Sequence, residues 1–396
     1  MAIDRTLRGR AAVAGIGESE YYRHGRSPDP EFVLALKAIQ AACEDAGIDP
    51  REIDGFSSYG MDRNGPVRLA AALGVHELKL GTMVWEGGGG GMAASIGNAA
   101  AATATGQADV VVAFRALAQG EFGRFGRSGA GRGEESGENA FLHPYGLFSP
   151  GQQYAMKYTR WMHEHGGIGM QAQKAVSLAS YQHAQNNPRA VMYGKPLTSE
   201  AYDASRWIVE PWRLYDFCQE NDGAAAVILV SAERARDLRR KPAYLLAAAQ
   251  GANKRWGDSI FNSPTYPTSN FTTLAPRLWE MSGLKPSDVD VVQSYENFTG
   301  GVVMSLVEHG LVEPDAVDEV LTVENLTVPN GLLPLNTSGG NLAEAYIHGF
   351  ELAIEGVRQL RGQSVNQVES AEVALVSAGP LTAPVSTLVF GSEATL

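Results

Sequence analysis

The chain has 396 residues, a formal net charge of −12 and a pI near 5.2, and 44% of its residues are hydrophobic. This length is enough for two or three units of ordinary domain size with a substantial core. The acidic balance argues against nucleic acid or an anionic membrane surface as the main partner.

Cysteine usage and hydropathy indicate the cellular setting. The two cysteines, Cys43 and Cys218, lie far apart in sequence, so no disulfide framework is expected. Residues 1–5 contain no secretory apolar core, and no uninterrupted apolar run approaches the roughly 20 residues of a membrane-spanning helix. We therefore expect a cytoplasmic protein without a membrane segment.

The first part of the chain alternates strand-like and helical segments. Apolar runs at Ala11 to Ile16 and at Leu78 to Val84 predict strands. The second run leads into five glycines, Gly87 to Gly91, an alanine-rich helical segment at Met92 to Thr105, and a further apolar run at Ala108 to Ala113. The predicted order is strand, glycine turn, helix, strand.

The glycine turn is the first candidate site. Bare backbone at Gly87, Gly88, Gly89 and Gly90 allows a ligand to come close, and amides in the first turn of a helix have no partner within the helix. Such amides can hold a phosphate or a developing oxyanion. The turn has no cysteine, serine or lysine to act as a nucleophile. Tight packing against a neighbouring strand is the alternative explanation for the glycines.

A long irregular stretch at residues 117–220 follows. It contains two predicted helices, Gly151 to His165 and Gln171 to Asn186, and ends before strand-like runs at Ala224 to Val230 and Ala243 to Ala249. Because insertions of this length commonly form lids or substrate loops, we expect a loop domain here.

Three groups of residues in this stretch allow more than one interpretation. Its glycine-rich part has three arginines that suit CoA phosphates, a partner interface or a disordered basic loop: Arg124, Arg127 and Arg132. Four aromatics suit either the wall of an apolar ligand site or a packed core: Trp207, Trp212, Tyr215 and Phe217. His163 and His165 are two residues apart, whereas ligands on one helix face need a spacing of three or four, so no metal site is expected there.

The last part of the chain repeats the first. Gly283 to Asp290 matches Gly47 to Asp54, since in each a glycine ends a helix and a proline blocks its continuation before a strand. Farther on, Ser338-Gly339-Gly340, a helix predicted at Asn341 to Leu360 and a strand at Ala371 to Ser377 parallel the glycine turn, helix and strand of the first part.

These elements predict an α/β fold of two duplicated βαβαβ halves, with helices packed on mixed, largely parallel sheets and an inserted loop domain. The N-terminal half is expected at residues 1–116, completed by 221–241, the loop domain at 117–220 and the C-terminal half at 242–396. Ligands of such sheets lie beyond the carboxyl ends of the strands, so the two glycine turns are expected to face one cleft.

Across its whole length the chain resembles the thiolase superfamily, and within it the sterol-carrier or lipid-transfer-protein thiolases. The resemblance rests on the duplicated halves, the loop domain, Asn221 to Ala226 before a strand, and the block from Asn336 to Gly362. Thiolases of this kind imply a nucleophilic cysteine at the first glycine-turn helix, a histidine in each of two loops and often a second cysteine near the C-terminus. The place of the nucleophile falls inside Gly87 to Gly91, so no acyl-enzyme is expected there.

The other catalytic motifs are also replaced. Tyr295-Glu296-Asn297-Phe298 stands where this branch has His-Asp-Cys-Phe, and Ala345-Tyr346-Ile347, followed by His348, stands where Gly-His-Pro is expected. The C-terminal cysteine-glycine turn becomes Ser377-Ala378-Gly379. Two tyrosines thus occupy the places of the two histidines.

This pattern is similar to the lipid-transfer-protein aldolases that degrade steroid side chains. The resemblance implies retro-aldol cleavage of a steroid β-hydroxyacyl-CoA to a C17 ketone and propionyl-CoA, with the CoA thioester as substrate and no cofactor. It also implies a homodimer that forms a heterotetramer with a small OB-fold, zinc-ribbon partner protein. Ser338 departs from the family's Asn-Thr-His-Gly-Gly, which leaves the substrate's exact identity open.

The reaction can be matched to residues. A retro-aldol cleavage needs a base for the β-hydroxyl, donors for the enolate oxygen and an acid for the enolate carbon. The amides of Gly87 to Gly90 and of Gly379 are candidates for holding the thioester oxygen. Tyr295 and Tyr346 are the predicted acid–base pair, with their two roles unassigned, and His348 is a candidate relay. Since tyrosine titrates near 10, it acts as a base at neutral pH only with help from a cation or a relay.

Two other functions remain open from sequence. The first is a degenerate thiolase or acyltransferase with an unorthodox nucleophile such as Cys218. A small buried hydrophobic residue is the competing interpretation of Cys218. The second is a non-catalytic acyl-CoA or lipid carrier that kept the pocket and lost the chemistry.

Overall fold

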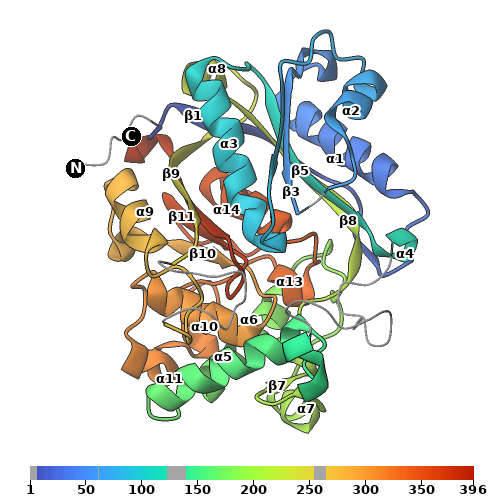
Figure 1. Cartoon of the computed structure of the whole chain (residues 1–396). Coiled ribbons are helices and arrows are strands. Elements are labelled where there is room, and N and C mark those ends of the chain that lie inside the picture. Colours follow the sequence, from blue (N-terminus) through green and yellow to red (C-terminus); the bar gives the residue numbers. More distant parts are fainter. Residues whose placement is uncertain (1–6, 61, 123–139, 254–264) are drawn as a thin grey trace.

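A ten-stranded mixed sheet forms the centre of the computed structural model, which describes residues 7–60, 62–122, 140–253 and 265–396 (Figure 1). Nine strands follow the order β10-β11-β12-β9-β1-β8-β5-β3-β4, and β2 pairs with β8. The strands of this sheet are β1 Ala11–Glu18, β2 Tyr22–Arg23, β3 Gly55–Tyr59, β4 Leu80–Val84, β5 Val111–Ala118, β8 Asn221–Ser231, β9 Ala243–Gly251, β10 Val291–Ser294, β11 Val373–Ala378 and β12 Val385–Gly391.

Helices cover this sheet, and a small two-stranded sheet, β6 Trp207–Val209 with β7 Trp212–Arg213, lies outside it. The helices are α1 Glu31–Ala46, α2 Pro66–Leu73, α3 Met92–Thr105, α4 Gln119–Phe122, α5 Pro150–Glu164, α6 Met170–Ala184, α7 Ser199–Ala204, α8 Ala232–Arg236, α9 Leu274–Ser282, α10 Thr299–Glu308, α11 Val317–Val320, α12 Val323–Leu326, α13 Gly340–Ala343 and α14 Phe350–Arg361. Within the described ranges, no helix is both long and apolar enough to cross a membrane.

The sheet is mixed, as predicted, but its parallel pairs are confined to the outer strands. β3 is parallel to β4 and β5, and β10 is parallel to β11, whereas β8, β1, β9 and β12 pair antiparallel with their neighbours. The expectation of largely parallel sheets is therefore too strong. β12 follows β11 after the short segment 379–384, too short for the crossover that parallel pairing requires, so the chain turns back.

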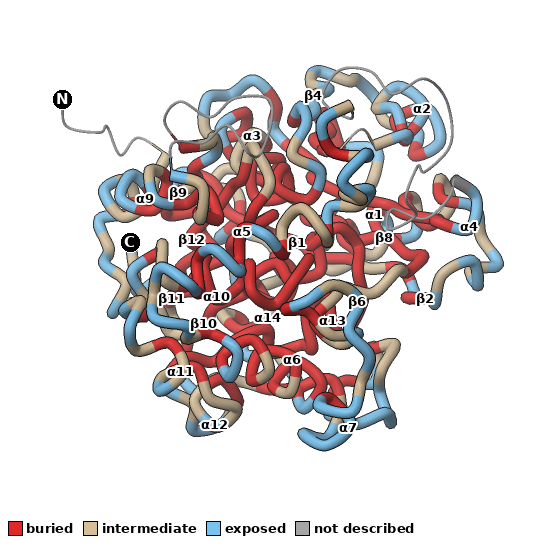
Figure 2. The backbone as a smooth tube through the Cα atoms, turned by 60° about the horizontal axis from the view of Figure 1, so that its bottom comes forward, coloured by how far each residue is buried: buried red, intermediate tan, exposed pale blue. Residues whose placement is uncertain are grey.

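The two halves of the sheet are joined loosely and enclose two helices. β1 and β9 meet at only two residue pairs, Ala12 with Tyr244 and Val13 with Ala243. α3 contacts β8 from one half and β9 and β12 from the other, and α14 contacts β10 and β11 as well as β8. Figure 1 shows α3 and α14 at the middle of the molecule, between these strands. Figure 2 shows the same central region as the buried part of the chain.

The internal duplication is visible in hydrogen bonds as well as in element order. Gly47 and Gly283 end α1 and α9 in the left-handed conformation, with φ of 72° and 71°. The carboxylate of Asp54 accepts the amides of Asp109 and Val110 ahead of β5. In the same way, Asp290 accepts the amides of Glu372 and Val373 at the start of β11. Each half thus uses an aspartate before one strand to fix the start of its parallel neighbour.

The predicted helix from Asn341 to Leu360 is instead two helices. α13 ends at Ala343, α14 begins at Phe350, and residues 344–349 form a connector between them. The break occurs because His348 and Gly349 take positive φ values of 57° and 86°, which an α-helix does not allow. The connector carries two of the predicted site residues, Tyr346 and His348.

Candidate active site

The two tyrosines predicted to act together share a hydrogen bond. Tyr295 directly follows β10, and Tyr346 lies in the connector between α13 and α14. Their hydroxyl oxygens are 2.7 Å apart, and their ring centroids are 5.9 Å apart with the ring planes at 72°. Both side chains are buried. The structure thus brings together two phenols from segments that are 51 residues apart in the chain.

His348 lies beside the phenol pair. Its ring centroid is 5.7 Å from that of Tyr346 and 6.5 Å from that of Tyr295. On another side it stacks on Tyr59, whose hydroxyl donates to the His348 carbonyl at 2.9 Å. This second contact fixes the backbone of His348 in its left-handed conformation, next to the phenols.

A buried arginine supplies positive charge close to the pair. Arg115 on β5 places its guanidinium 5.5 Å from the ring centroid of Tyr59 and donates to the Tyr59 carbonyl at 2.9 Å. It also forms an ion pair with Asp62 at 3.1 Å. Arg115 lowers the pKa of Tyr346 and of His348 through its charge.

Burial dominates the titration of all three site residues. It raises the pKa of Tyr295 well above its usual value near 10, and the neighbouring Tyr346 raises it further. Burial also raises the pKa of Tyr346 well above 10, although the hydrogen bond shared with Tyr295 and the charge of Arg115 oppose this shift. Burial lowers the pKa of His348 well below 6.5. The histidine is therefore neutral at physiological pH. The charge of Arg115 makes the phenolate of Tyr346 easier to form than it would be with burial alone.

The glycine turn meets the phenol of Tyr295. A Cβ placed on Gly89 would lie 2.3 Å from the Tyr295 hydroxyl oxygen, and one on Gly349 would lie 2.3 Å from Tyr295 Cδ2. Gly88 faces the His348 ring, with 3.5 Å between its ideal Cβ and Nε2. At Gly89, within the turn where a thiolase carries its nucleophile, any side chain would thus clash with the Tyr295 ring.

The second glycine segment adjoins the first. An ideal Cβ on Gly379 would lie 2.4 Å from the backbone nitrogen of Gly90, so the two backbones are in close contact. The Gly90 amide donates to the Gly87 carbonyl at 2.7 Å and is therefore engaged within the turn. Gly88 and Gly89 occupy the first turn of the short 3-10 helix Gly88–Gly91, where amides have no acceptor within the helix. Of the amides predicted to hold an oxyanion, Gly88 and Gly89 fit this role best.

A methyl group at Gly89 should disrupt the site without unfolding the protein. Gly89→Ala would push the Tyr295 ring away, so we expect kcat to fall at least about tenfold, with an overpacking cost of about 1–3 kcal/mol. Gly65→Ala is the control, because an ideal Cβ at Gly65 has no atom within 4 Å. Steady-state kinetics and thermal melts of both variants test this. Wild-type turnover by Gly89→Ala would show that the contact is irrelevant to the reaction.

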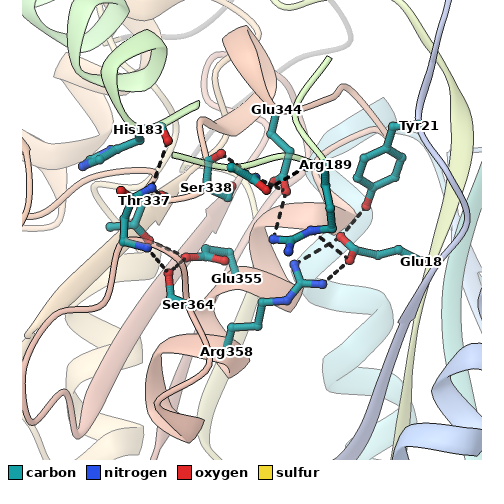
Figure 3. Close-up of polar contacts among 12 residues, drawn as sticks. Glu18, Tyr21, His183, Arg189, Thr337, Ser338, Glu344, Glu355, Arg358 and Ser364 are labelled. Atoms are coloured by element: carbon teal, nitrogen blue, oxygen red, sulfur yellow. Dashed lines mark hydrogen bonds and ion pairs between the residues drawn. The ribbon is translucent and has the colours of Figure 1, made fainter. Parts of the chain in front are cut away.

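The connector that carries Tyr346 is also fixed at its first residue by charges. Glu344 accepts from Asn187 Nδ2 at 2.8 Å and lies 3.6 Å from Arg189. Arg189 in turn approaches Glu18 at 3.7 Å, and Glu18 is paired with Arg358 of α14 (Figure 3). Burial raises the pKa of Glu344 to about 7, and the nearby Glu18 carboxylate adds to this shift. These ion pairs link Arg189, in the segment between α6 and α7, to the connector, to β1 and to α14.

Several polar residues that hold the site were missed from sequence. Glu296, Asn341 and Glu351 are fully buried and hydrogen-bonded to one another between the Tyr295 segment and the connector. Burial raises the pKa of Glu296 to about 7 and that of Glu351 well above 4.5. The available signal was two acidic residues, one after each tyrosine, inside otherwise apolar segments.

Three further candidates, Cys218, Trp212 and Ser338, are also placed by the structure. Burial raises the pKa of the Cys218 thiol far above its ordinary value, which is the opposite of what an activated nucleophile requires. Trp212 is fully buried and stacks on Phe298 with ring centroids 4.6 Å apart, so it packs in the core. Ser338 is buried, and its hydroxyl accepts the Gly340 amide at 3.4 Å.

The histidines near the end of α5 do not form a metal site. His163 is exposed near the end of α5, and His165 Nδ1 lies 2.8 Å from the Trp161 carbonyl oxygen. Over the described residues, no group of three or more histidine, cysteine, aspartate or glutamate side chains is placed to hold a metal ion. The three loop arginines fall outside the described residues: Arg124, Arg127 and Arg132.

Several known proteins share the fold of this chain. Residues 252–392 match the family model described as thiolase C-terminal domain-like. The solved structure of an Ltp2-ChsH2(DUF35) aldolase superposes with a TM-score of 0.89 at 37% identity, covering 99% of this chain and all of that one. Human mitochondrial 3-ketoacyl-CoA thiolase, at 15% identity, shares the fold with a TM-score of 0.70 over 98% of this chain and all of that one. The fold is therefore that of a thiolase, and the glycine turn 87–91 contains no cysteine.

Two curated relatives cover the full length. The 17-hydroxy-3-oxo-4-pregnene-20-carboxyl-CoA lyase of Mycobacterium tuberculosis is 41% identical over 97% of this chain and all of its own. The steroid side-chain-cleaving aldolase of Thermomonospora curvata is 39% identical over 98% of this chain and 99% of its own. The chain belongs to this aldolase family of the thiolase superfamily, a family of carbon–carbon lyases.

Proposed function

We propose that this chain cleaves the side chain of a steroid β-hydroxyacyl-CoA by a retro-aldol reaction, releasing a ketone and propionyl-CoA or a similar short acyl-CoA. The observation that carries the proposal is the 2.7 Å hydrogen bond between two buried phenols beside a glycine turn that has no nucleophile. The family's named activities supply the substrate class.

The phenol pair provides both proton transfers. Tyr346, whose phenolate the positive charge of Arg115 stabilises against the effect of burial, takes the proton of the β-hydroxyl. The bond between the α and β carbons then breaks, which leaves a ketone at the former β carbon and an enolate on the CoA thioester. Tyr295 protonates the α carbon of that enolate. The hydrogen bond between the phenols then returns the proton from Tyr346 to Tyr295, which restores both residues.

The backbone and His348 complete the proposed site. The amides of Gly88 and Gly89 are suited to stabilise the enolate oxygen, since they lie beside the phenols in the first turn of a helix. Neutral His348 serves as a ring neighbour of Tyr346, with the ring centroids 5.7 Å apart, and not as a charged acid. No cofactor and no metal take part in this scheme.

The direct test is incubation of the purified chain with a 17-hydroxy steroid acyl-CoA, with and without its partner, while ketone and short acyl-CoA are quantified. Stoichiometric release of both products is expected. Binding of the acyl-CoA without release, in the presence of the partner, would favour the carrier function instead.

Thiol modification separates the aldolase from a degenerate thiolase. Because Cys43 is buried, Cys218 is partly buried and both thiols have raised pKa values, neither is expected to take part, so alkylation of whichever thiol reacts should leave kcat within about twofold. Mass spectrometry of the alkylated protein and of a quenched turnover mixture checks this. A trapped acyl group on Cys218 would overturn the proposal and favour the thiolase.

We also propose that the enzyme works as a homodimer bound to a small OB-fold, zinc-ribbon partner. β4 is the outermost strand of the sheet, paired only with β3 among the described strands, and Met83 and Trp85 are exposed at and beside it. Such an edge is suited to pairing with a second copy. The similarity to the Ltp2-ChsH2(DUF35) aldolase, whose name joins two components, supports a partner chain.

A further inference from the structure

A buried asparagine connects the backbone segments of the two tyrosines. Asn341, the second residue of α13, donates its amide to Glu296 Oε2 at 2.7 Å, and its Oδ1 accepts the Glu296 amide at 2.9 Å. Glu296 directly follows Tyr295. The two reciprocal bonds therefore fix the chain immediately after one phenol relative to the start of α13.

The same asparagine reaches the other phenol through a carboxylate. Asn341 Nδ2 donates to Glu351 Oε1, and Glu351 Oε2 accepts the Ile347 amide at 3.2 Å. Ile347 directly follows Tyr346, whose own amide donates to Asn221 Oδ1 at 2.7 Å. Asn341 and Glu351 thus complete a path of hydrogen bonds from the residue after Tyr295 to the residue after Tyr346.

The surroundings are built for this close approach. Asn341, Glu296 and Glu351 have no exposed surface. An ideal Cβ on Gly340 would lie 2.0 Å from Glu296 Oε2, so only glycine leaves room for the carboxylate. Ser180 of α6 donates to Glu296 Oε1 at 2.5 Å, and this hydrogen bond holds the second carboxylate oxygen in place. The network therefore has one arrangement, and each buried group in it has a partner.

We propose that Asn341, acting with Glu296 and Glu351, is the positioning residue that sets the distance and orientation between the phenols of Tyr295 and Tyr346. The inference rests on the acid–base function proposed above for the two tyrosines. Its physical basis is the steep dependence of proton transfer on geometry, because a misplacement of about 1 Å can cost 10²-fold in rate. The alternative is a network that contributes only to stability.

A double-mutant cycle distinguishes the two. Asn341→Ala is made in the wild-type chain and in the Tyr346→Phe chain, and kcat, KM and the melting temperature are measured for all four proteins in the presence of the partner. If Asn341 acts through the phenols, Asn341→Ala should lower kcat about 10- to 100-fold in the wild type, with KM changed less than about threefold. In the Tyr346→Phe chain it should lower kcat less than about threefold further.

A matched control and a second variant accompany the cycle. Asn366→Ala removes another buried amide, which donates to the carbonyls of His183 at 2.9 Å and Thr337 at 2.6 Å, and it should lower stability while kcat stays within about threefold. Glu351→Gln weakens the network at its other end by removing one acceptor. It provides the same cycle if Asn341→Ala does not fold.

Equal losses of kcat from Asn341→Ala in both backgrounds would overturn the inference while leaving the aldolase proposal intact. A loss equal to that of Asn366→Ala would overturn it in the same way. If Tyr346→Phe alone retains wild-type kcat, the acid–base proposal fails, and the positioning role fails with it.

Discussion

Replacing Tyr346 with phenylalanine should lower kcat by about 10²- to 10⁴-fold, the range that general acid–base catalysis typically contributes. The variant removes only the hydroxyl that shares a 2.7 Å hydrogen bond with Tyr295, so the ring and its packing remain. Tyr295→Phe should cause a loss of similar size, because each phenol needs the other to recover its proton. The double variant should be little worse than either single one, since residues that act as a unit do not contribute additively.

The pH dependence should identify the base. Burial raises the pKa of both phenols above 10, so the phenolate is scarce at neutral pH and kcat/KM of the wild type should rise as pH increases into the alkaline range. This rise should disappear in Tyr346→Phe if that residue is the base. Tyr244→Phe is a control, because its buried hydroxyl lies on β9 and its pKa is raised by burial without any contact with the pair. Activities within a few-fold of wild type in both site variants would remove the tyrosines from the mechanism.

Replacing Arg358 with methionine should destabilise the fold by about 3–5 kcal/mol, because it leaves a buried carboxylate without its main partner. Glu18 on β1 pairs with both terminal nitrogens of Arg358 and accepts the Tyr21 hydroxyl at 2.6 Å. Burial opposes ionisation of Glu18, yet the charge and hydrogen bonds of Arg358 hold its pKa below 4.5. The midpoint of urea unfolding at neutral pH measures the loss.

The direction of the pH effect follows from that lowered pKa. The stabilisation from Glu18 is present above the carboxyl's unfolded pKa and is lost as pH falls through the lower folded value. In Arg358→Met, burial raises the pKa of Glu18 instead, so the stability deficit should shrink as the pH is lowered. Glu18→Gln combined with Arg358→Met should recover part of the loss, since no buried charge remains. A single variant as stable as wild type would show that Arg189 suffices as the partner of Glu18.

Much of the fold could be predicted from local sequence, because the decisive signals are local. α3 has the predicted bounds Met92 to Thr105, since a glycine turn precedes it and Gly106 ends it in the left-handed conformation. The duplication was recognisable from Gly47 and Gly283 for the same reason. The antiparallel pairing of β8 and β1 was not, because it depends on how the chain returns from the loop region and not on any pattern within the strands.

The site was predictable only in part. Tyr295 and Tyr346 were identified by their place in family motifs, and their contact is a tertiary fact that neither segment encodes alone. The composition around Tyr346 predicted a continuous helix, because alanine and leucine favour helices. It could not show that the buried Glu351 carboxylate accepts a backbone amide of the connector, that of Ile347. The two acidic residues in apolar segments, Glu296 and Glu351, were the one local signal of the buried network, and its pairing through Asn341 joins residues 10 to 45 positions apart.

The contact between Gly89 and Tyr295 also limits how such enzymes can change over time. A side chain at position 89 and the phenol of a tyrosine at position 295 would occupy the same volume, so this backbone cannot hold both. An ancestor with a reactive thiol in this turn therefore had to lose it before, or together with, the arrival of the ring. Engineering this chain back toward thioester condensation would for the same reason require paired substitutions at positions 89 and 295. A side chain added at 89 alone would clash with Tyr295, and a smaller residue at 295 alone would leave a cavity.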